Sequence, residues 1–100
     1  MSLPPFLKAM ESYDPEFAQA MEKIVSLSLM EGSLDPKTRT LIALALDAAH
    51  GASEGVASLA QQARKMGVTD QEIAEALRLA YFTSGNSVLI SSFSAFTNKE

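Results

Sequence analysis

LDPKTRTLIALALDAAHGASEGVASLAQQARKMGVTDQEIAE, residues 34–75, is the stretch that decides the fold. Asp35 can cap a helix whose first position is Pro36, where a missing backbone N–H costs nothing. The apolar residues that follow fill two faces of this helix: Leu41, Leu44, Ala45 and Ala48 on one, and Ile42, Leu46 and Ala49 on the other. A helix that is apolar over most of its circumference must be covered on several sides, so we expect it to form the core. Gly51 then supplies a left-handed stop, and a new helix begins near Ser53.

The flanking residues show the same helical signals. Asp14 followed by Pro15 repeats the cap-then-proline start, and Thr69 with Glu72 forms a capping box. The triplet Ser84-Gly85-Asn86 predicts a break before a last, serine-rich helix. The expected helices cover about residues 6–13, 15–31, 36–50, 53–66, 69–83 and 87–97. We therefore predict one all-α domain over residues 1–100, without internal linkers.

The composition predicts an oligomer. Of the 100 residues, 47% are hydrophobic and only 20% are charged. A chain of this length buries only about two-thirds of its unfolded surface, so a single copy has little interior for so many apolar side chains. Association of identical copies is the simplest way to cover them. The net charge is −4, and only eight residues are basic, so the composition does not indicate a positively charged surface for nucleic acid or anionic lipid.

The chain contains no cysteine. Disulfides, thiolate metal sites and thiol redox chemistry are therefore excluded for the chain on its own. No signal-peptide pattern and no apolar run of membrane-spanning length is present, so a cytoplasmic protein is the expectation.

Three parts of the sequence resemble the carboxymuconolactone decarboxylase and alkylhydroperoxidase-D-like family: the block 34–39, the helix leading to Gly51, and the block 67–77. The resemblance implies an orthogonal helical domain of about six helices with a family core at about 34–97. It also implies assembly into trimers or hexamers.

The redox branch of this family carries a Cys-x-x-Cys pair, a histidine one turn later and a glutamate on the preceding helix. The corresponding positions here are Ala52 and Gly55 for the cysteines, Leu59 for the histidine and Thr40 for the glutamate. None of these four residues has a thiol, an imidazole or a carboxyl group, so none can supply the nucleophile or the proton transfer of the redox mechanism. The resemblance therefore implies a member without thiol peroxidase activity.

The decarboxylase branch lacks the cysteine pair, so its chemistry is not removed by that loss. Decarboxylation of a lactone acid needs a cation for the carboxylate and a proton donor for the developing enolate. Near the glycine turn, Arg39 and His50 are the candidates. As a first-turn residue, Arg39 is more often simply solvated.

His50 is the only histidine, and with Asp47 and Glu54 it forms the pattern D-x-x-H-x-x-x-E. On an unbroken helix this spacing would place all three side chains on one face, as an acid–base or ligand set. Because Gly51 is expected to break the helix, the alternative is that His50 satisfies a free carbonyl in the last turn while Glu54 favours the next helix N-terminus. No metal site and no cofactor are predicted. Tyr81 is a further pocket candidate, expected as a buried ring with its hydroxyl at an edge.

Three functions stay open, and with them whether the chain is an enzyme. The first is binding or conversion of a small organic molecule of lactone or acid type, without a cofactor, in a pocket beside the Gly51 turn. His50 and Glu54 would be its catalytic residues, and Arg39, Asp47 and Tyr81 would line the pocket. The second is a catalytically inactive interaction or scaffold protein. The third is peroxidase activity with every thiol supplied by a partner.

Overall fold

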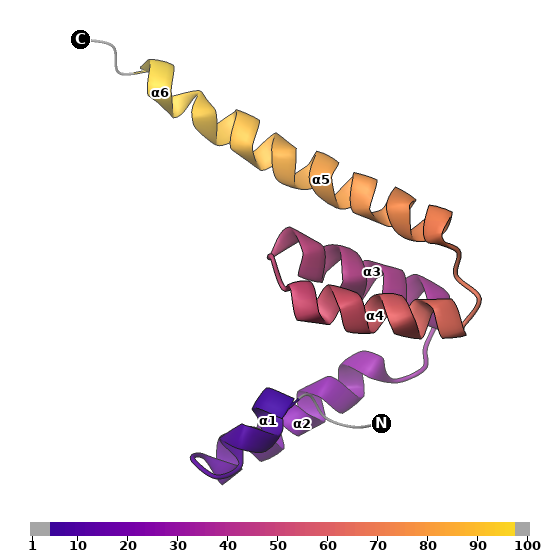
Figure 1. The fold of residues 1–100 in the computed structure, drawn as a ribbon. Helices are drawn as coiled ribbons and strands as arrows, with labels where there is room; N and C mark the ends of the chain where they lie inside the picture. The colour runs from indigo at the N-terminus through magenta and orange to yellow at the C-terminus, as the bar shows by residue number, and fades with distance from the viewer. Residues whose placement is uncertain (1–4, 98–100) are drawn as a thin grey trace. The chain divides into compact units, whose positions relative to one another are not determined.

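The computed structural model describes residues 5–97, and these residues are helical without any strand, which confirms the all-α fold. The helices are α1 (Pro5–Met10), α2 (Pro15–Leu29), α3 (Pro36–Ala49), α4 (Ser53–Lys65), α5 (Asp70–Ser92) and α6 (Ser94–Thr97) (Figure 1). The chain divides into two compact units, Met1–Ser33 and Leu34–Glu100. The organisation as one domain stays a prediction.

The first unit is a pair of helices. Asp14 caps α2 by accepting a hydrogen bond from the Phe17 backbone N–H at 3.2 Å, and Pro15 occupies the first helical position. α1 packs against α2, and Leu7 and Ala18 are the buried residues of the two helices. This confirms the cap-then-proline start that the sequence predicts.

The second unit is organised around α3, which contacts both α4 and α5 (Figure 1). Its core is small and mostly aliphatic, and Leu44 of α3 and Ala63 of α4 are fully buried in it. Val68 and Ile73 extend this core to the start of α5. The central position predicted for α3 is thus confirmed.

Both tight turns of this unit are built on a glycine in the left-handed region. Gly51 has φ +75° and Gly67 has φ +91°. After α3, the N–H of Gly51 donates to the Ala48 carbonyl and that of Ala52 donates to the Asp47 carbonyl, at 3.1 and 2.9 Å. This pair of bonds is the Schellman motif, and residues 63–68 repeat it after α4. The turn therefore returns the chain antiparallel, so that α4 lies along α3.

The predicted break at Ser84-Gly85-Asn86 is wrong, because α5 continues without interruption from Asp70 to Ser92. A glycine inside a helix costs only about 1 kcal/mol relative to alanine, and no proline removes a backbone N–H here. Hydroxyls in this region bond to their own helix, as when Thr83 Oγ1 donates to the Leu79 and Ala80 carbonyls. The result is a helix about 34 Å long, and Figure 1 shows its C-terminal half running beyond the α3–α4 pair.

Candidate functional site

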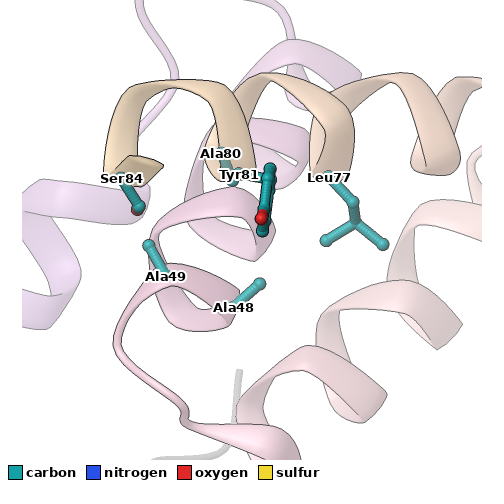
Figure 2. Close-up of a pocket in the computed structure, with 6 residues that line it drawn as sticks. All are labelled: Ala48, Ala49, Leu77, Ala80, Tyr81 and Ser84. Atoms are coloured by element: carbon teal, nitrogen blue, oxygen red, sulfur yellow. The ribbon is translucent and has the colours of Figure 1, made fainter. Parts of the chain in front are cut away.

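A groove lies between the last turn of α3 and the middle of α5. It measures about 320 Å³ and is lined by Ala48, Ala49, Leu77, Ala80, Tyr81 and Ser84. Figure 2 shows the side chains of α5 projecting toward the two alanines of α3. Pockets that hold small organic ligands begin at about 300 Å³, so this space suits a small molecule.

The groove is apolar apart from two hydroxyl groups, and none of its lining residues is charged. Within the described part of the chain, the hydroxyls of Tyr81 and Ser84 have no hydrogen-bond partner. They are therefore available to a ligand, as donors or as acceptors.

Tyr81 was predicted to be a buried ring, and that prediction is wrong, because its side chain is 82% exposed. α3 ends at Ala49, and only the small side chains of Ala48 and Ala49 face Tyr81 across the groove, so the ring stays uncovered (Figure 2).

A second groove, of about 370 Å³, follows the other edge of the α3–α5 pair. Its polar lining includes Glu72, which is already engaged in the capping box. The Thr69 backbone N–H donates to the Glu72 carboxylate at 2.8 Å and, with the Thr69 hydroxyl, lowers the pKa of that carboxyl. Glu72 therefore has a structural role at the start of α5.

His50 is the C-cap residue of α3, and its side chain is exposed. Its Nδ1 lies 2.8 Å from the Leu46 carbonyl oxygen, so the neutral ring carries its proton on Nδ1 and leaves Nε2 as the acceptor. This is the helix-end arrangement that the sequence offered as the alternative to an acid–base set. His50 does not belong to the lining of the α3–α5 groove.

The pattern formed by Asp47, His50 and Glu54 is not assembled into a cluster. Among residues 5–97, no ion pair joins His50 to either carboxylate, and no group of three such residues is placed to hold a metal ion. The Asp47 carboxylate instead lies over the first turn of α4, where a Cβ atom at Gly55 would overlap it. Glu54 is exposed in that first turn. The left-handed turn at Gly51 interrupts the helix on which the sequence spacing would have aligned the three side chains.

Arg39 is half-buried near the start of α3 and its Nε is shielded from solvent, whereas the sequence favoured a solvated side chain. It lines neither groove. Of the five predicted site residues, Tyr81 is therefore the one that the structure places in the α3–α5 groove.

The positions of the redox residues have ordinary structural roles in this chain. Thr40 is buried, and its hydroxyl donates to the Pro36 carbonyl at 2.8 Å. Leu59 packs against the core. Ala52 is the N-cap residue of α4 and makes no side-chain capping bond there.

Sequence reasoning missed most of the groove lining. The available signal was the spacing of Leu77, Tyr81 and Ser84, which lie four and three residues apart and share one face of a helix. The small side chains of Ala48 and Ala49 leave the space open opposite them.

None of the helices described is both long enough and apolar enough to cross a membrane. No curated protein and no solved structure was found to be significantly similar to this chain. The model of the carboxymuconolactone decarboxylase family, in contrast, matches residues 15–98, which include the groove, both glycine turns and the whole of the helices from α2 to α6. The chain thus belongs to the carboxymuconolactone decarboxylase family.

Proposed function

We propose that this protein binds a small, largely apolar organic molecule of the lactone type in the α3–α5 groove, without a cofactor. The observation that carries the proposal is an apolar groove with two hydroxyls, those of Tyr81 and Ser84, that have no partner among the described residues. Membership of the family supports a ligand of this class.

The lining favours an uncharged ligand over an ionised acid of the same type. A carboxylate transferred into an apolar groove loses hydration and finds no cation among the lining residues. A lactone carbonyl needs only one hydrogen-bond donor, and the Tyr81 hydroxyl supplies it. We therefore expect a neutral lactone to bind more tightly than the matching carboxylate.

The test compares coumarin, a neutral bicyclic lactone, with coumarin-3-carboxylate by NMR titration. Coumarin should shift the methyl signals of Ala48 and Ala49, and the carboxylate should shift them less at equal concentration. Tyr81→Phe should weaken binding about 3- to 10-fold, the value of one hydrogen bond. Ala49→Leu, at an exposed position, should fill the groove and abolish binding.

Tyr13→Phe is the matched control, because Tyr13 is also highly exposed but lies in the other unit. It should bind coumarin as the wild type does. The proposal would be contradicted if coumarin caused no shift in the wild-type spectrum, or if Ala49→Leu bound coumarin as tightly as the wild type does.

For a conversion of the bound molecule, His50 and Glu54 remain the proposed proton carriers, with Arg39 and Asp47 in supporting roles. His50 is suited to this because Nε2 is free to take a proton while Nδ1 is held by the Leu46 carbonyl. His50 is not a lining residue, so its proton would pass to or from the bound molecule through one water molecule. His50→Gln should then abolish turnover and leave the coumarin titration unchanged. Turnover that survives this substitution would exclude His50 as the proton carrier.

A catalytically inactive interaction protein is the second candidate, favoured by the many large apolar side chains that α5 exposes. It predicts self-association together with a groove that binds neither probe. Because an oligomer can also bind a ligand, the titration, and not the mass, separates the two functions.

A further inference from the structure

The C-terminal part of α5, continued by α6, carries an exposed apolar stripe that no contact of its own unit explains. The stripe consists of Leu79, Phe82, Asn86, Leu89, Phe93 and Phe96. Its five apolar members are 60–66% exposed. We call these six residues the α5 seam.

The spacing within the α5 seam alternates strictly between three and four residues, from Leu79 to Phe96. At about 100° per residue, the six positions fall within an arc of about 100° on one side of the helix. The backbone at Phe93 keeps a right-handed helical conformation, with φ −61° and ψ −23°, so the stripe continues into α6. This spacing is that of the a and d positions of a coiled coil, where helices pack side by side.

Beyond Leu79, which borders the second groove, the α5 seam faces away from the α3 side of its helix. Ile73 is buried and Leu77 packs against the core, so these two residues mark the side of α5 that faces α3. By helical geometry this side lies roughly 180° from the seam. The α3 contacts therefore leave the stripe uncovered from Phe82 onward, whereas Leu79 at its start borders the second groove beside α3.

We infer that the α5 seam pairs with the same seam of a second copy of this chain. No charged residue lies between Arg78 and Lys99, so the stripe has no charge by which to select a different partner. Two copies with a net charge of −4 repel each other, and a charge-free surface is where they approach at the lowest electrostatic cost.

The area of the stripe fits such a pairing. The five apolar seam residues and the adjacent Ile90 expose on the order of 700 Å² of side chain, close to the roughly 800 Å² that each partner buries in a standard interface. An isolated helix end has little stability in water, and pairing would supply the tertiary packing that it lacks.

Asn86 is the only polar member of the α5 seam and lies near its middle. A single asparagine at an a position lowers the stability of a helix pair but fixes its register. In two paired α5 seams, Asn86 would therefore favour one register of the two helices over registers that are shifted along the seam.

The experiment measures the mass of the full chain by sedimentation equilibrium at micromolar concentration. The wild type should have the mass of at least two chains. Leu89→Glu should raise the dissociation constant at least 10-fold, because it places a charge in the centre of the interface. Ser91→Glu is the matched control, since it adds the same charge two residues further on and about 200° around the helix; it should associate as the wild type does.

Leu89 is largely exposed in the single chain, so the glutamate should leave the helix content unchanged, which circular dichroism checks. Asn86→Leu provides an independent variant and should tighten association at least 3-fold. A wild-type chain of monomer mass would overturn the pairing and leave the stripe to another kind of partner. The same conclusion follows if Leu89→Glu retains the wild-type mass, if Ser91→Glu dissociates equally, or if Asn86→Leu fails to tighten association.

Discussion

Asp35 shows how much a single side chain organises at the residue scale. Its Oδ1 accepts a hydrogen bond from the Thr38 backbone N–H at 2.9 Å, and its Oδ2 accepts one from the Thr38 hydroxyl at 3.1 Å. The backbone bond, with the hydroxyl bond second, lowers the pKa of Asp35 from its ordinary value. Asp35 therefore caps the N-terminus of α3 as the charged carboxylate.

This linkage gives a pH-dependent prediction. Because the pKa of Asp35 is lower in the folded than in the unfolded chain, its stabilisation is fully present above the unfolded value near 3.8 and is lost as the pH falls through the folded value. Asp35→Asn, which keeps a capping oxygen without the charge, should melt near the wild-type temperature at neutral pH and lose less stability below pH 4. Melting temperatures between pH 2 and 7 measure this, and parallel curves for the two proteins would contradict it.

At the scale of elements, the two kinds of glycine in this chain have opposite roles. Gly51 has φ +75° and allows the turn between α3 and α4. Gly85 lies inside α5, and a Cβ atom there would meet nothing within 4 Å. The first glycine is required by the backbone, and the second only weakens a helix.

Alanine substitutions should therefore change stability in opposite directions. Gly51→Ala should lower the free energy of unfolding by about 1–2 kcal/mol, because a side chain is strained in the left-handed region. Gly85→Ala should raise it by about 0.5–1 kcal/mol through helix propensity. Urea denaturation measures both changes, and the same sign for the two variants would refute this account of the turn and of the continuous α5.

At the scale of the whole molecule, the chemistry is limited by side chains that are absent from the sequence. The chain has no cysteine, and the glutamate position of the redox branch is Thr40, whose hydroxyl is bound to its own helix. The histidine position is Leu59, which packs against the core.

The purified protein should therefore not reduce cumene hydroperoxide with dithiothreitol faster than a heat-denatured sample does, because thiol peroxidases attack the peroxide with a cysteine thiolate. Consumption of hydroperoxide is followed by absorbance. A rate above the denatured control that scales with protein concentration would return peroxidase activity to consideration. Such a result would leave the coumarin titration unaffected, so the two tests are independent.

The sequence by itself determined where α2, α3, α4 and α5 begin and where the two glycine turns lie. Asp35 with Pro36, Gly51, and Thr69 with Glu72 act through hydrogen bonds to residues at most five positions away, so their effect is contained in the local sequence. The family was also visible there, because its blocks are local and contiguous.

Only the tertiary structure decided which side chains share a site. The groove joins Ala48 to Tyr81 and Ser84 across α3 and α5, and the space between them depends on how far each helix extends. The continuity of α5 through Gly85 aligned the seam on one face, and the small side chains of Ala48 and Ala49 opposite Tyr81 leave its ring exposed. These outcomes depend on contacts and helix lengths over the whole unit, and local sequence does not contain them.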